Sequence, residues 1–148
     1  MMASKQKQAA IVTGGCHGIG LAMSEYLASK GLRVAVVDIN ADLGRKAALD
    51  LANAHPEATI VFKECDVTSW QQQERVFREV WEEFGGIDVV VANAGISEGF
   101  SSMYRLEQNH PVEPDRKVLD VNVFGVICCT SLPSHGPEQK LTRLLVLY

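Results

Sequence analysis

No stretch of this sequence approaches the ~18 consecutive apolar residues that a membrane-spanning helix needs. Its 14 Lys and Arg residues gather into no stripe and are outnumbered by 18 Asp and Glu residues, which gives a net charge of −4. Residues 1–8 are polar, with no apolar segment of signal-peptide length behind them. We therefore expect no nucleic-acid partner, no membrane segment and a cytoplasmic location.

The four cysteines lack the spacing of a disulfide framework or of a metal site. Cys128 and Cys129 are adjacent, whereas Cys16 and Cys65 stand alone, so no Cys-x-x-Cys pair occurs. We expect all four to be reduced core residues, and we expect no metal ion.

The composition that is present is that of a folded globular protein, with 47% hydrophobic and 22% charged residues. A length of 148 residues suits one domain with its own core, so residues 1–148 are treated as a single domain.

Four short runs rich in apolar and β-branched residues alternate with segments of helical periodicity. The runs are residues 9–13, 32–38, 59–63 and 87–92, and a further helical pattern covers residues 115–132. Such alternation is typical of a parallel sheet with helices on both faces. It predicts an α/β, doubly wound, three-layer fold of Rossmann type with strand order 3-2-1-4. Its ligand crevice would lie where the order reverses, between strands 1 and 4.

A glycine-rich loop separates the first strand from the first helix, at Thr13-Gly14-Gly15-Cys16-His17-Gly18-Ile19-Gly20. Glycine lets the backbone turn sharply and approach a ligand closely, so N–H groups at the start of the helix can bind a pyrophosphate. The alternative is a plain strand-to-helix turn. The apolar spacing of the helix predicts a buried face made of Ile19, Ala22, Met23, Tyr26 and Leu27.

The loop resembles the cofactor motif of the short-chain dehydrogenase/reductase family, and the resemblance covers residues 8–130. It implies an NAD(P)-dependent oxidoreductase that exchanges a hydride with a small-molecule alcohol or ketone. The helix start at Gln71-Gln72-Gln73 resembles the hydroxyprostaglandin dehydrogenase branch but indicates no substrate. The residues of the loop that are expected to contact the cofactor are Gly14, Cys16, His17, Gly18, Ile19 and Gly20.

Asp38 ends the second predicted strand, where a dinucleotide fold places the acid that accepts hydrogen bonds from the adenosine ribose. A carboxylate there favours NAD over NADP, because the 2′-phosphate of NADP would meet a like charge. The following residue, Ile39, is expected to line the same site. The alternative for Asp38 is a solvated acid at a strand end.

The resemblance extends to two further segments. Asp66 and Val67 resemble the pair that meets the adenine, although an Asp preceding a helix cap is the alternative. The segment Asn93-Ala94-Gly95 resembles the Asn-Asn-Ala-Gly motif near the nicotinamide ribose, with Ala92 in place of the first Asn.

Asn122 resembles the helix asparagine that holds a water in the family's proton relay and is the candidate catalytic residue. A structural, fully hydrogen-bonded Asn is the alternative. The family's catalytic Ser, Tyr and Lys are missing after Asn122, where no Tyr-x-x-x-Lys occurs. The one such pair, Tyr26 and Lys30, lies on the first helix, where Tyr26 is expected to be a core residue.

Residues 133–148 depart from the family, and the chain is expected to be truncated at its C-terminus, with an incomplete sheet. The fourth strand would then be an apolar edge, covered by residues 144–148 or by a partner subunit. We expect NAD binding with little turnover. The rivals are a catalytically inactive nucleotide-binding or interaction module that forms oligomers through the helix at 115–132, and a truncated product without function.

Overall fold

The computed structural model of the chain describes residues 7–97, 116–132 and 143–146. The strands in chain order are β1 (Ala9–Thr13), β2 (Arg33–Asp38), β3 (Ile60–Glu64), β4 (Val89–Ala92) and β5 (Arg143–Val146). The helices are α1 (Gly18–Ser29), α2 (Ala41–Ala54), α3 (Trp70–Phe84), α5 (Lys117–Leu119), the π-helical turn η1 (Asp120–Phe124) and α6 (Gly125–Ser131).

The five strands form one parallel sheet in the order β3-β2-β1-β4-β5. In this sheet β1 is central, with Ile11 opposite Ala35 of β2 on one side and Val90 of β4 on the other. The order reverses direction between β1 and β4, which confirms the predicted 3-2-1-4 arrangement. The ligand crevice of such a sheet opens at the carboxyl ends of these two strands.

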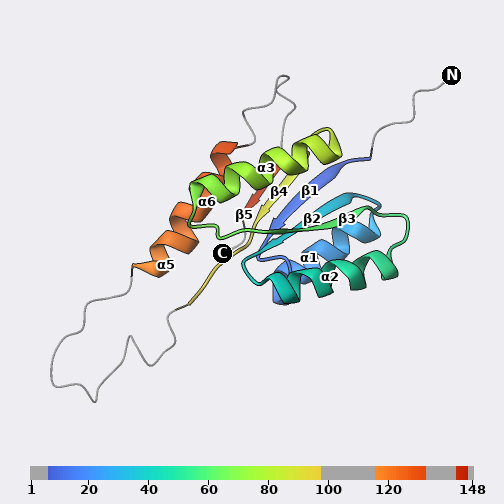
Figure 1. Cartoon of the computed structure of the whole chain (residues 1–148), viewed down its shortest axis with the longest axis horizontal. Coiled ribbons are helices and arrows are strands. Elements are labelled where there is room, and N and C mark those ends of the chain that lie inside the picture. Colours follow the sequence, from blue (N-terminus) through green and yellow to red (C-terminus); the bar gives the residue numbers. More distant parts are fainter. Residues whose placement is uncertain (1–6, 98–115, 133–142, 147–148) are drawn as a thin grey trace, which may run out of the picture.

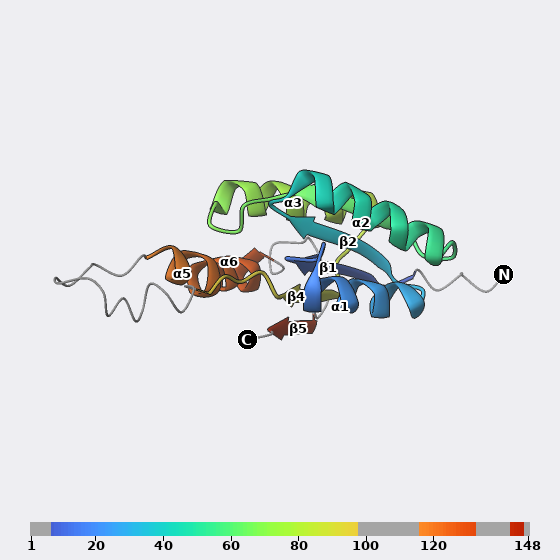
Figure 2. The same ribbon diagram turned by 90° about the horizontal axis from the view of Figure 1, so that it is seen from below.

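The outer edge of β4 is covered by β5, which pairs with it in parallel from Val89↔Arg143 to Ala92↔Val146 (Figures 1 and 2). From the sequence, this segment could have been either a strand or a helix. The sequence also left two candidates to cover the edge of β4, namely this tail and a partner subunit. The pairing satisfies backbone groups of β4 that would otherwise form an open edge. A single chain therefore covers β4 by itself.

Helices lie on both faces of the sheet, α3 and α6 on one and α1 and α2 on the other (Figure 1). Two apolar clusters mark these two interfaces, as expected for strands that are buried on both faces. The first joins residues of the sheet to α3 and α6, including Ile11, Val37, Val80, Phe84 and Cys129. The second joins the other face to α1 and α2, including Val12, Val36, Ala28, Ala47 and Leu51. These interfaces make the predicted three layers.

The predicted buried face of α1 is partly wrong, although its members Met23 and Leu27 pack against the second cluster. Ile19 and Tyr26 are 69% and 57% exposed, and the buried residues of α1 are Gly20, Ser24 and Ala28. The Ser24 hydroxyl donates to the Gly20 carbonyl at 2.9 Å and lies 3.4 Å from that of Gly15. The helix therefore lies so close to the sheet that only small residues fit beneath it, and its larger apolar residues lie at the flanks.

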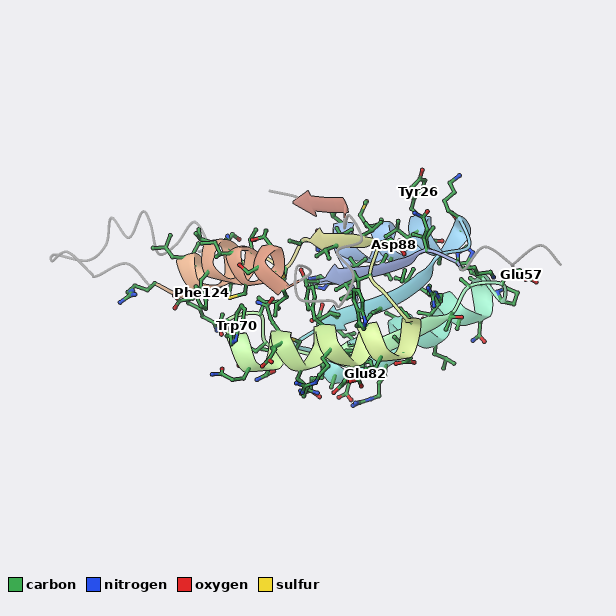
Figure 3. All side chains as sticks on the ribbon, turned by 90° about the horizontal axis from the view of Figure 1, so that it is seen from above. Tyr26, Glu57, Trp70, Glu82, Asp88 and Phe124 are labelled. Carbon is green, nitrogen blue, oxygen red and sulfur yellow. The ribbon has the colours of Figure 1, made fainter. Side chains whose placement is uncertain are left out.

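Tyr26 is thus a surface residue, not the core residue that its spacing suggested. Its side chain projects from the outer side of α1 (Figure 3), and the Lys30 ammonium lies 5.3 Å from the centre of its ring. The close packing of α1 against the sheet directs the pair outward.

The helix predicted at 115–132 is present over its described part, residues 116–132, as α5, η1 and α6 in succession. Its buried residues are Val121, Gly125, Cys128 and Cys129, and Cys129 belongs to the cluster between the sheet and α3. Among the described residues, no helix is long and apolar enough to cross a bilayer.

Candidate functional site

The glycine loop between β1 and α1 is shaped by close backbone contacts. Gly14 and Gly18 have φ angles of 62° and 54°, in the left-handed region that glycine adopts most readily. A Cβ atom on Gly20 would clash with the Gly14 carbonyl oxygen and with the Asn93 side chain. The loop is thus folded back on the first turn of α1, and a side chain at Gly20 would fill this space.

Thr13 ties the glycine loop to the segment after β4. Its hydroxyl accepts hydrogen bonds from the backbone N–H groups of Asn93 and Ala94, both at 3.1 Å. The Asn93 amide in turn donates to the carbonyls of Thr13 and Gly14, at 3.0 and 3.2 Å. The structure therefore brings together the two glycine-bearing loops predicted to flank the crevice. Thr13 was not among the predicted site residues, because a hydroxyl at a strand end gives no sign of its partners 80 residues away.

The N-terminus of α1 differs from those of α2 and α3. Among the described residues, no side chain caps α1, whose N-cap residue is His17. By contrast, Asn40 and Ser69 accept hydrogen bonds from N–H groups in the first turns of α2 and α3. The first-turn N–H groups and the positive end of the helix dipole can therefore attract an anion.

Asp38 lies at the end of β2, next to the glycine loop, and is 7% exposed. Its carboxylate accepts hydrogen bonds from the backbone N–H groups of Asn40, at 3.1 Å, and Cys16, at 3.4 Å. The predicted alternative of a solvated strand-end acid is therefore wrong, because the side chain is buried and directed toward the loop. Ile39 beside it is 65% exposed.

The thiol of Cys16 lies among polar atoms of His17 and Asp38. Its Sγ atom is 3.5 Å from His17 Nδ1, which in turn is 3.9 Å from Asp38 Oδ2. Burial, then the hydrogen bond to Asp38 and the negative charge of Asp38, raise the pKa of the Cys16 thiol to about 12. Cys16 is therefore a protonated thiol near neutral pH and not a nucleophile.

Asp66 and Val67 follow β3, as predicted, but their contacts are local. Oδ1 of Asp66 accepts hydrogen bonds from the backbone N–H of Thr68 at 2.9 Å and from its hydroxyl at 2.7 Å. This is the turn before α3 that the sequence offered as the alternative. The adenine contact of Asp66 and Val67 stays a prediction.

Gln73 holds α3 to the neighbouring elements and was missed as a structural residue. It is 1% exposed, donates to the Val67 and Gly125 carbonyls, and accepts a hydrogen bond from the Cys129 thiol at 3.1 Å. A polar residue on the apolar side of α3 was the signal that could have revealed it.

Asn122 lies in the π-helical turn η1 and faces the segment after β4. Both polar atoms of its amide are paired with the backbone of Ile96, at 2.8 and 2.9 Å. A π-helical turn often accompanies a functional site. Asn122 is therefore fully hydrogen-bonded, as its structural alternative predicts, while its part in a proton relay stays a prediction.

The predicted residues fall into one connected site and one outlying pair. The loop residues, Asp38 and the 93–95 segment lie together at the carboxyl ends of β1, β2 and β4, and Asn122 reaches the same place through Ile96. Asp66 and Val67 lie at the outer strand β3. An anion-binding helix terminus beside a buried carboxylate fits a ligand with a diphosphate and a ribose.

Comparison with known proteins gives a consistent result. A family model described as short chain dehydrogenase matches residues 8–135. The human 15-hydroxyprostaglandin dehydrogenase [NAD(+)] is 40% identical over 125 residues, which are 83% of this chain and 41% of that protein.

Two solved structures are similar over nearly the whole chain. NAD⁺-bound xylitol dehydrogenase has a TM-score of 0.82 and 28% identity, covering 97% of this chain and 54% of that one. An alcohol dehydrogenase of the archaeon Thermococcus sibiricus, complexed with 5-hydroxy-NADP, has a TM-score of 0.79 and 26% identity, covering 95% and 57%. The chain thus spans 41% of the human relative's length and about half of each structural neighbour.

Proposed function

Because the chain belongs to the short-chain dehydrogenase family, we propose that it binds NAD at the carboxyl ends of β1, β2 and β4. The observation that carries this proposal is the start of α1, where no described side chain caps the helix and a Cβ on Gly20 would fill the turn. The pyrophosphate would lie over this turn, held by N–H groups of residues 14–20.

The other parts of the cofactor are assigned to the remaining predicted residues. Asp38 accepts from the adenosine ribose, with Ile39 beside it, and Asp66 and Val67 meet the adenine. The segment 93–95 lies against the nicotinamide ribose. Gly95 lies beside Asn122, since a Cβ on Gly95 would be in ordinary contact with Asn122 Oδ1 at 3.4 Å.

The preference for NAD over NADP rests on charge. The buried Asp38 carboxylate repels a 2′-phosphate on the ribose that it binds. The two nearest cations on α2, Arg45 and Lys46, pair with Asp42 at 2.8 Å and with Asp50 at 2.5 Å.

The reaction proposed for the family site is oxidoreduction of a small-molecule alcohol or ketone. NAD supplies the hydride acceptor when bound. The chain's own part is to hold the cofactor, to fix the 93–97 segment through Asn122, and to keep Asn122 where a relay water would bind. In the 148-residue chain we propose binding with little turnover.

A second candidate function is an interaction module in which a second copy of the chain covers the helix formed by α5, η1 and α6. Four residues on this helix form an exposed apolar stripe. They are Leu119, Val123, Phe124 and Ile127, each between 45% and 60% exposed. An exposed apolar stripe on one helical segment suits a self-complementary contact.

We keep the cytoplasmic location as a prediction, in keeping with the four free cysteines.

Titration of the purified chain with NADH, followed by nucleotide fluorescence, tests the proposed function. We expect saturable binding that Asp38→Asn weakens by about 10–100-fold, the equivalent of one charge-assisted hydrogen bond. The matched control is Asp50→Asn on the surface of α2, which should leave the affinity unchanged. NADPH should compete poorly. Equal affinity of the native chain and Asp38→Asn, with both folded by circular dichroism, would refute the assignment.

A further inference from the structure

The residues Cys16, His17 and Asp38 place a thiol, an imidazole and a carboxylate around one point. One donor atom from each lies within 4.8 Å of the other two. Cys16 and Asp38 are 5% and 7% exposed, whereas the His17 side chain is 76% exposed. Two ligand atoms are therefore fixed by burial, and the third comes from a ring that can turn toward them.

The spacing of these atoms suits a tetrahedral ion. Zn²⁺ binds sulfur at about 2.3 Å and nitrogen or oxygen at about 2.0–2.2 Å, so its ligand atoms lie roughly 3.3–3.8 Å apart. The distances are 3.5 Å from Cys16 Sγ to His17 Nδ1 and 3.9 Å from His17 Nδ1 to Asp38 Oδ2. Cys16 Sγ and a carboxylate oxygen of Asp38 lie within 4.8 Å of each other. A turn of the exposed His17 ring together with a small shift of these two side chains brings all three atoms into range.

We propose that Cys16, His17 and Asp38 form a binding site for Zn²⁺ or a similar divalent transition metal, and that metal and dinucleotide exclude one another. Mixed sulfur, nitrogen and oxygen ligands are those that Zn²⁺ prefers. On binding, the Cys16 thiol releases its proton to solvent, and the resulting thiolate sulfur coordinates the metal. The exposed side of His17 leaves the fourth position to water.

The exclusion follows from the position of the site. Asp38 is the residue assigned to the adenosine ribose, and Cys16 and His17 lie in the loop assigned to the pyrophosphate, so this half of the inference rests on the proposed function. A metal that takes the Asp38 carboxylate removes the acceptor of the ribose hydroxyls. The metal site itself does not depend on NAD binding.

This site was not predicted from the sequence, because Asp38 lies far along the chain from Cys16 and His17. Asp38 is 22 residues from Cys16, and parallel pairing of β1 with β2 brings the two together. Among the residues that the structure describes, no other group of three such side chains meets the same distance limit.

Metal binding is tested first without nucleotide, on the full 148-residue chain. Zn²⁺ affinity is measured by competition with a chromogenic chelator, and Co²⁺ is used as a spectroscopic probe for thiolate and tetrahedral coordination. Cys16→Ser and His17→Ala should each weaken Zn²⁺ binding at least tenfold and remove the thiolate-to-cobalt band. The matched controls, Cys128→Ser on α6 and His55→Ala at the C-cap of α2, should retain both the Zn²⁺ affinity and the cobalt band.

Unchanged Zn²⁺ affinity in Cys16→Ser or His17→Ala would overturn the site, as would loss of binding in the controls alone. Because His17 is exposed, its replacement leaves the core intact, and the folding of each variant is checked by circular dichroism.

Exclusion is tested by NADH titrations at increasing Zn²⁺ concentration. The apparent Kd for NADH should rise in proportion to Zn²⁺ in the native chain and stay constant in His17→Ala. Simultaneous binding of both ligands would overturn the exclusion. If NADH fails to bind at any Zn²⁺ concentration, the proposed function and the exclusion are both refuted, whereas the chelator and cobalt measurements still decide the metal site.

Discussion

Asn122 and Ile96 form a two-point contact across the crevice end of the sheet. The Ile96 backbone N–H donates to Asn122 Oδ1 at 2.9 Å, and Asn122 Nδ2 donates to the Ile96 carbonyl at 2.8 Å. The Asn122 side-chain amide thus pairs with both the N–H and the carbonyl of Ile96, as the backbone of a neighbouring strand would. The contact joins the π-helical turn η1 to the segment that follows β4, so the position of one depends on the other.

Replacing this asparagine should loosen the segment after β4. We expect Asn122→Ala to lower the free energy of unfolding by about 1–2 kcal/mol, because two hydrogen bonds are lost while water can reach the 39%-exposed Ile96. Asn122→Asp keeps the acceptor and loses the donor, so its free energy of unfolding should lie between those of the native chain and Asn122→Ala. Urea unfolding gives both values. Equal stability of all three chains would contradict a positioning role for the amide.

Gly20 offers a sharper test of the loop. Gly20→Ala should destabilise the chain by about 1–3 kcal/mol and abolish NADH binding, because its Cβ clashes with the Gly14 carbonyl. The matched control is Gly31→Ala, outside the loop, where a Cβ would meet nothing within 4 Å. This control still costs roughly 1 kcal/mol, because Gly31 has a φ angle of 77°. Thermal unfolding and NADH fluorescence report the two effects, and a Gly20→Ala chain that binds like the native one would refute the close approach.

The sequence predicted the strand order and the meeting of the two glycine-bearing loops, because a buried parallel sheet has a strong apolar signature. It could not predict which side of α1 is buried. That choice depends on how close the helix lies, and a helix near the sheet buries Ser24 in place of Tyr26. The contact between Cys16 and Asp38 was equally hidden, since it arises only when β1 and β2 pair.

The buried thiols predict a loss of stability in alkali. Burial raises the pKa of Cys65 to about 11 and that of Cys129 to about 12, from an ordinary value of 9.0. The folded chain therefore favours the protonated thiols, and this stabilisation is complete below pH 9 and is lost as the pH rises toward 11–12.

Urea midpoints at pH 8 and pH 10.5 measure this effect. The native chain should lose more stability between the two pH values than a Cys65→Ala/Cys129→Ala double variant. All other groups are common to the two chains, so their contributions cancel in the comparison. Parallel losses in the two chains would show that the thiols are not responsible.

A polypeptide of these 148 residues should oxidise no secondary alcohol above background with NAD. Proton removal in the family needs a Tyr whose pKa, about 10 when free, is lowered by a Lys four residues later. No such pair follows Asn122, and Tyr26 with Lys30 lies at the surface of α1. NADH absorbance with a panel of secondary alcohols is the measurement. A robust rate that Asn122→Ala abolishes would contradict this expectation.

The exposed stripe on α5, η1 and α6 leads to a prediction about assembly. If a second copy covers it, the native chain should elute with twice the mass of one chain in size-exclusion chromatography with light scattering. Phe124→Asp should convert it to a monomer, because a charge in an apolar contact loses its hydration without gaining a partner. Leu49→Asp is the matched control, since Leu49 is 62% exposed on α2, at the far face of the sheet. Charge as such would act equally at both positions, so dissociation by Phe124→Asp alone assigns the contact to the stripe, and a native monomer rejects it.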